Sequence, residues 1–104
     1  MNTDPVSIEV ADDGAIVVVG EIDMAAGPII DAAILAQEER GAAVVLDLGA
    51  VSFIDSSGLR SLLSASRRAT DRDSSVVLRS VGPEVARLLD ITGTARMFEI
   101  QVES

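Results

Sequence analysis

The chain has 104 residues and a formal net charge of −9 at neutral pH, and it contains neither cysteine nor histidine. Disulfides, zinc sites of the usual ligand types and catalytic arrangements that need histidine or cysteine are therefore excluded. Every basic residue is an arginine and the carboxylates outnumber them, so the surface should repel nucleic acids and anionic membranes.

The chain begins with the pattern of a β-hairpin. Val6–Val10 alternates apolar and polar residues, as a half-exposed strand does, and Asp13-Gly14 is a hairpin turn signal. The β-branched run Ala15–Gly20 predicts a second strand, buried on both faces. The first strand should therefore pair antiparallel with the second and lie at an edge of the sheet.

A helix is predicted next. Pro28 suits the first helical position, and Arg40 and Gly41 are ordinary signals for the end of a helix. Apolar residues between them recur three and four positions apart. Ile29 and Ile30 are adjacent, so one of the two should lie outside the core.

The rest of the chain alternates strands and helices. We expect a buried strand at Val44–Leu48, a loop "GAVSFID", a helix to about Ala69, a polar connection "TDRDSS", a buried strand at Val76–Ser80, a helix from Pro83 to near Gly93, and an edge strand "MFEIQV". This order predicts an α/β fold: a mainly parallel sheet of about five strands with an antiparallel N-terminal edge strand, and helices after strands 2, 3 and 4.

The segment "VSFIDSSGLRSLL" (51–63) places a carboxylate and two hydroxyls where a strand leads into a helix. Functional groups of parallel sheets gather at the carboxyl ends of the strands. The polar residues expected at that end are Glu21, Asp23, Asp55, Ser56, Ser57 and Ser80. The sequence therefore indicates a candidate site formed by three loops.

Two interpretations of this site stay open. Asp55 and Ser56 can be a structural N-cap, because their side-chain oxygens accept bonds from free backbone N–H groups. Ser57, close to the first turn of the helix, can accept a phosphate from an external kinase, with the charge lying against the positive end of the helix. A hydrolase is not supported, because the chain has no histidine or lysine to activate a serine and no phosphate-binding loop.

The segment "VVLDLGAVSFIDSSGLRSLL" resembles the signature of STAS domains, specifically that of bacterial anti-sigma factor antagonists. "GEIDMAAGP" and "VARLLDITGTARMFEI" extend the resemblance over nearly the whole chain, so one STAS domain is expected over residues 1–104. The resemblance implies a binding protein rather than an enzyme. Its partner would be an anti-sigma factor, usually a serine kinase of the GHKL type, whose capture releases a sigma factor.

The resemblance also implies a switch. The kinase would phosphorylate Ser57, with Ser56 as a minor candidate, and a PP2C-type phosphatase would restore the active form. The residues expected to contact the partner are Asp23, Asp55, Ser56, Ser57, Gly58, Leu59 and Arg60. We expect no catalytic residue, cofactor, metal, nucleic acid or membrane partner, and a monomer when the protein is free.

Two features leave alternatives. The outer face of the predicted helix after the motif is unusually rich in arginine, with Arg60, Arg67 and Arg68, and can be either solvated or a partner contact. The domain can also belong to a stress-sensing complex, to a lipid or anion transport system, or to a nucleotide-binding module. The single-domain length and the intact acceptor serine favour the antagonist, and the absence of a signal-peptide pattern at the N-terminus favours a cytoplasmic location.

Overall fold

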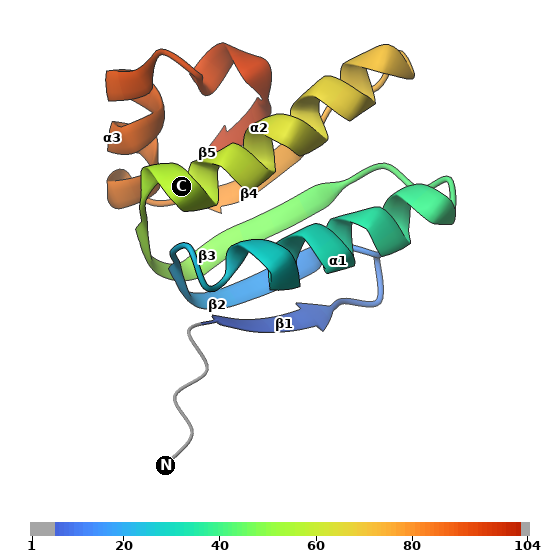
Figure 1. Ribbon diagram of the computed structural model, residues 1–104, viewed down its shortest axis with the longest axis horizontal. Helices are drawn as coiled ribbons and strands as arrows, with labels where there is room; N and C mark the ends of the chain where they lie inside the picture. The colour runs from blue at the N-terminus through green and yellow to red at the C-terminus, as the bar shows by residue number, and fades with distance from the viewer. Residues whose placement is uncertain (1–5, 103–104) are drawn as a thin grey trace.

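Within the part of the chain that the structure describes, five strands form one sheet and follow one another in the sheet as they do in the sequence. The computed structural model describes residues 6–102 (Figure 1). Strand β1 (Val6–Val10) pairs antiparallel with β2 (Ile16–Ile22), whereas β3 (Val45–Ile54), β4 (Val77–Val81) and β5 (Glu99–Val102) all run parallel to β2. The predicted α/β fold, with its antiparallel N-terminal edge strand and a last strand at the other edge, is therefore confirmed.

Three α-helices connect the parallel strands. Helix α1 (Gly27–Glu39) and helix α2 (Ser56–Asp71) lie side by side over one face of the sheet (Figure 1). Helix α3 (Pro83–Thr92) contacts β3 and the short 3-10 helix η1 (Ala95–Met97). Each α-helix thus follows β2, β3 or β4, as the order of the sequence patterns predicts.

The core lies between the sheet and these helices and is almost entirely aliphatic. Its fully buried side chains include Ile16, Val18 and Ile22 of β2, Leu46 and Leu48 of β3, Leu78 of β4, Ile30 and Ile34 of α1, and Leu62 of α2. Burial of each such side chain contributes about 1.5–3 kcal/mol relative to exposure. Of the two adjacent isoleucines of α1, Ile30 is buried and Ile29 is exposed.

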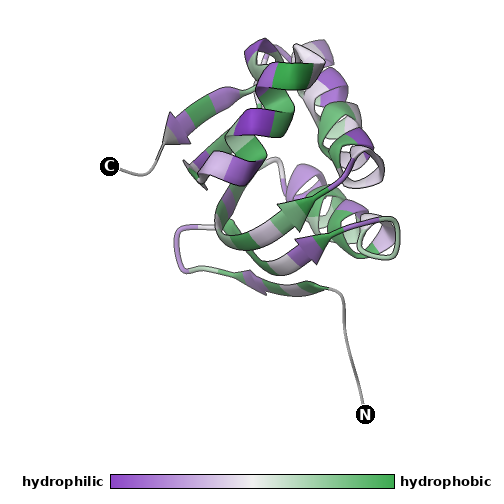
Figure 2. Cartoon of the chain, turned by 90° about the vertical axis from the view of Figure 1, so that its left-hand side faces the viewer, coloured by the Kyte–Doolittle hydropathy of each residue, from purple (hydrophilic) through white to green (hydrophobic). Residues whose placement is uncertain are grey.

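The expectation that β2 is buried on both faces is wrong. Val18 faces the helices and is buried, but Val19 points the other way and is 45% exposed. Phe53 of β3 is also exposed. Figure 2 shows why, because α1 and α2 lie on the same side of β1, β2 and β3. The β-branched run is explained by strand pairing and one buried face, not by a second layer of helices.

The expectation that "GAVSFID" forms a loop is wrong as well. All residues of this segment except the last continue β3 to Ile54. The pairing with β2 shows two irregularities, at each of which β3 contains one more residue than β2. Near the first one, the Asp47 carboxylate accepts a hydrogen bond from the Gly49 N–H at 3.0 Å. The bulges interrupt the alternation of buried and exposed residues, and this hides the strand from a period-two pattern.

The remaining boundaries differ by a few residues. Helix α2 continues beyond Ala69 to Asp71, and β4 begins one residue later than expected. The start of "MFEIQV" is not strand: Met97 belongs to η1, and the Phe98 N–H donates to the carbonyl of Ala95 at 3.2 Å. The predicted helix end at Gly93 is confirmed, with a left-handed φ of 70°.

The β1–β2 turn is the expected hairpin, with Gly14 at a φ of 88°. The Asp13 carboxylate accepts the Ala15 N–H at 3.0 Å and pairs with the Arg79 guanidinium at 3.2 Å. The hydrogen bond from Ala15 and the charge of Arg79 lower the pKa of Asp13. This ion pair links the hairpin to β4.

Ser80 has a left-handed φ of 58° inside β4, where a residue with a Cβ is strained. We expect Ser80→Gly to raise the free energy of unfolding by about 0.5–1 kcal/mol, because relief of about 1–2 kcal/mol of strain outweighs the greater backbone entropy of glycine in the unfolded chain. Denaturant unfolding measures the change. Ser80→Ala keeps the Cβ and should give no gain, so equal effects of the two substitutions would contradict the strain.

Candidate functional site

The carboxyl ends of β2 and β3 lie side by side. Ile22 is paired with Ile54, and the Asp55 N–H donates to the carbonyl of Ile22 at 3.1 Å. Asp23 and Asp55 therefore follow neighbouring strand ends, as a parallel sheet requires. In Figure 1 this is the left-hand end of the domain, where α1 and α2 also begin.

Asp55 is the N-cap of α2. Its backbone is extended, and its carboxylate accepts a hydrogen bond from the Gly58 N–H at 2.9 Å. Its carbonyl accepts the first helical hydrogen bond, from the Leu59 N–H at 2.9 Å. A capping role for Ser56, which the sequence left open, is therefore not observed, because the carboxylate of Asp55 fulfils it.

Ser56 and Ser57 occupy the first two positions of α2. Ser56 is exposed and Ser57 is partly buried. Neither hydroxyl takes part in the cap, which the Asp55–Gly58 hydrogen bond provides. Backbone N–H groups of the first turn and the helix dipole favour negative charge at these positions.

Gly58 allows the start of α2 to lie directly against the end of β2. A Cβ at this position would collide with the side-chain Cγ2 and the carbonyl oxygen of Ile22 and would lie 3.0 Å from the carbonyl carbon. Leu59, the next residue, is only 3% exposed and belongs to the core. Gly58 and Leu59, both expected as contact residues, therefore face inward and position the neighbouring residues, whereas Arg60 is exposed.

Asp23 begins the turn into α1. Its carboxylate accepts the Ala26 N–H at 3.1 Å, and α1 then begins at Gly27 beside α2, where a Cβ would lie 3.4 Å from the hydroxyl of Ser61. Met24, within the same turn, is 75% exposed. The sequence analysis missed this side chain, although a large apolar residue directly after Asp23, between a predicted strand and a predicted helix, is a readable signal.

Ser80 does not join this site. Ser80 lies within β4, beside Gly49 of β3: a Cβ added to Gly49 would lie 3.2 Å from the Cβ of Ser80. The site itself lies beyond Ile54, at the end of β3. The bulge between Arg79 and Val81 alters the pairing of β4 with β5 here. The expected third contributor is thus displaced along the strand.

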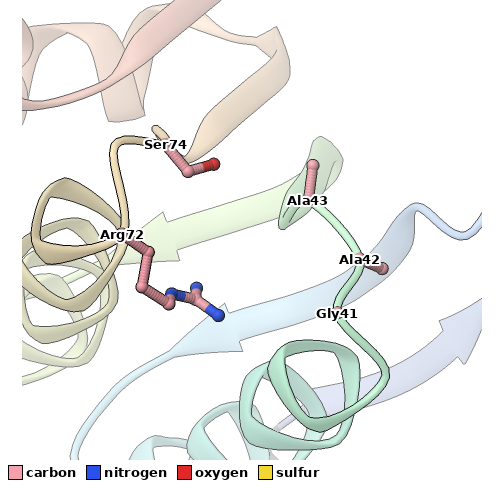
Figure 3. A pocket seen from close by; sticks show the side chains of 5 residues that line it. All are labelled: Gly41, Ala42, Ala43, Arg72 and Ser74. Atoms are coloured by element: carbon pink, nitrogen blue, oxygen red, sulfur yellow. The ribbon is translucent and has the colours of Figure 1, made fainter.

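An open pocket lies at the opposite end of the domain, between the loop after α1 and the end of α2. It is lined by Gly41, Ala42, Ala43, Arg72 and Ser74 (Figure 3). Arg72 extends across it toward Gly41.

Residues 6–102 contain no cluster of three or more acidic side chains suited to a metal ion. No helix in the same range has the length and hydropathy needed to cross a membrane.

The close approach at Gly58 generates a stability prediction. Gly58→Ala should lower the free energy of unfolding by about 1–3 kcal/mol, because the start of α2 must move away from Ile22. Gly82→Ala is the matched control, since no atom lies within 4 Å of its Cβ position, and it should cost less than about 1 kcal/mol as a change of N-cap residue. Denaturant unfolding of both variants checks this, and equal losses would contradict the contact.

Comparison with known proteins agrees with this geometry. The family model described as "STAS domain" matches residues 5–103. The anti-sigma-B factor antagonist of Listeria monocytogenes is 34% identical over 87 residues, which cover 83% of this chain and 76% of that protein. The crystal structure of an anti-sigma factor antagonist from Mycobacterium paratuberculosis aligns with a TM-score of 0.74 and 32% identity over 92% of this chain and 83% of that one.

A more distant structure shares the fold. Unphosphorylated SpoIIAA, an anti-sigma factor antagonist, aligns with a TM-score of 0.71 and 24% identity over 94% of this chain and 89% of its own. Phosphorylated Bacillus SpoIIAA aligns with a TM-score of 0.66 and 22% identity over 94% and 92% of the two chains. The sheet order, the strand-to-helix junction at Asp55 and the family match lead to one conclusion: the chain belongs to the STAS domain family.

Proposed function

We propose that this protein is an anti-sigma factor antagonist that binds an anti-sigma factor, a serine kinase of the GHKL type, and thereby releases a sigma factor. Phosphorylation of Ser57 by the bound kinase would end the interaction, and a PP2C-type phosphatase would restore it. The names of the similar proteins from Listeria monocytogenes and Mycobacterium paratuberculosis support the antagonist role. The geometry of the α2 N-terminus supports the switch.

The observation that carries the proposal is the division of roles between Asp55 and the two serines. The cap is provided by the Asp55 carboxylate at 2.9 Å from the Gly58 nitrogen. The Ser57 hydroxyl is therefore not needed to hold the helix. A phosphate there adds a charge of about −1.5 to −2 next to backbone N–H groups that favour it. Modification should change the surface and leave the fold intact.

The proposed contact surface combines charged and apolar groups. Asp23, Ser57 and Arg60 lie at the end of the domain where α1 and α2 begin, and Met24 adds an exposed apolar side chain beside Asp23. A dianion on Ser57 would be placed close in the chain to the Asp55 carboxylate. Repulsion of acidic groups on the partner, and the cost of removing water from the phosphate, would then weaken binding.

Kinase assays test the acceptor. We expect incubation with purified GHKL-type serine kinases from the same genome and ATP to place phosphate mainly on Ser57, as located by mass spectrometry. Ser57→Ala should abolish the modification, whereas Ser56→Ala should preserve it. Phosphate mainly on Ser56 or on Ser80 would contradict the assignment.

Binding measurements test the switch. Phosphorylated protein should bind the kinase at least about tenfold more weakly than the unmodified form, because like charges across an interface cost more than the roughly 1.4 kcal/mol that a tenfold loss represents. Its unfolding free energy should change by no more than about 1 kcal/mol. Ser57→Asp should weaken binding only in part, and Ser57→Ala should stay bound in ATP. Equal affinities of the two forms would overturn the switch.

A further inference from the structure

Helix α2 carries an uneven share of the positive charge of the protein. The chain has a formal net charge of −9 with eight arginines, and four of these arginines, at positions 60, 67, 68 and 72, lie on α2 or at its C-cap. The acidic residue within the helix is Asp71, at its last position. Helix α2 is therefore locally basic on an acidic domain.

Two of these arginines neutralise a residue of the same domain. The Arg68 Nε atom lies 3.0 Å from both carboxylate oxygens of Glu38 on α1, and Arg72 lies 3.9 Å from the same carboxylate. Glu38 is nearly buried, with 10% of its side chain exposed. Arg68 and Arg72 thus support the packing of α1 against α2. The expectation that Arg68 lies on the outer face of the helix is wrong, because its guanidinium pairs with Glu38 of the same domain.

The other two arginines of the helix do not pair with Glu38. Arg60 and Arg67 are exposed, and the ion pairs found within residues 6–102 involve neither of them. They are seven residues apart with the short Ser64 between them, so all three lie on one face of the helix. We call Arg60, Ser64 and Arg67 the arginine stripe. It begins one helical turn after Ser57 and is therefore continuous with the proposed contact surface.

We propose that the arginine stripe docks against an acidic surface of the anti-sigma factor partner. The inference rests on the proposed function and adds the chemistry of the partner. Guanidinium groups recognise carboxylates through paired hydrogen bonds. A domain that is acidic elsewhere would repel such a surface in any other orientation, so the stripe would select one orientation of the complex.

The position of Arg60 also links the stripe to the switch. Arg60 is three residues after Ser57, a spacing at which side chains on a helix meet. A phosphate on Ser57 would attract the Arg60 guanidinium and withdraw it from the carboxylates of the partner. Phosphorylation would then act twice: it adds negative charge and removes a positive contact.

Charge-changing variants test the stripe. With the kinase that phosphorylates Ser57 as the partner, we expect Arg60→Glu and Arg67→Glu each to weaken binding at least about tenfold at about 50 mM NaCl, with a smaller loss at about 300 mM. Arg40→Glu, a matched control at the exposed C-cap of α1, should stay within about twofold of the original affinity. Arg60→Gln and Arg67→Gln keep helix propensity and should show intermediate losses. Circular dichroism checks folding.

A double comparison tests the link to Ser57. In Arg60→Gln, phosphorylation should reduce affinity by a smaller factor than in the original protein, because the contact it would remove is already absent. An equal factor in both backgrounds would overturn the link. If Arg40→Glu lost as much affinity for the kinase as the stripe variants, or if the stripe variants lost none, the proposal of a docking surface would be overturned.

A measurement without the kinase separates this proposal from the proposed function. Titration of isotope-labelled protein with a poly-glutamate peptide at low salt should shift the amide signals of Arg60, Ser64 and Arg67, and Arg60→Glu combined with Arg67→Glu should abolish those shifts. Absence of shifts on this face would contradict the stripe even if the kinase binds. If the unmodified protein bound no kinase but the peptide still shifted these amide signals, the result would contradict the proposed function instead.

Discussion

The close approach of Gly58 to the end of β2 is the constraint on which the candidate site depends. The carbonyl of Ile22 accepts the Asp55 N–H at 3.1 Å, and three residues later the backbone of Gly58 lies against the same residue. No side chain larger than hydrogen fits there without movement. Helix α2 consequently begins at a defined place beside β2, and Ser56 and Ser57, which lie between these two contacts, are held at the end of the sheet beside the turn that contains Asp23.

This arrangement suits a modification that changes binding without changing the fold. A carboxylate provides the cap, and the serine hydroxyls lie where a helix favours negative charge. A cap formed by Ser57 would couple phosphorylation to the stability of the helix. Separation of the two roles allows the surface to change charge while the core between sheet and helices, which Leu59 and Leu62 of α2 help to form, stays in place.

The two sides of α2 use arginine for different purposes. On the side facing α1, the nearly buried Glu38 requires a charged partner, because an unpaired carboxylate there would be costly, and Arg68 and Arg72 provide it. On the outward side, Arg60 and Arg67 face solvent. The same residue type therefore stabilises helix packing in one direction and, in our proposal, recognises an acidic partner in the other.

The order of strands and helices, the hairpin at Asp13–Gly14 and the end of α3 at Gly93 were all predictable from the sequence, because turn residues, helix signals and hydrophobic periods act within a few positions along the chain. The motif Asp55-Ser56-Ser57-Gly58, which contains the proposed acceptor, was visible for the same reason. Other features depend on residues that are distant in sequence. Whether Asp55 or Ser56 forms the cap, why position 58 must be glycine, and which arginine meets Glu38 are decided by packing of α2 against β2 and α1. The continuation of β3 through its bulges and the displacement of Ser80 from the site likewise follow from pairing between strands, which leaves no local pattern to read.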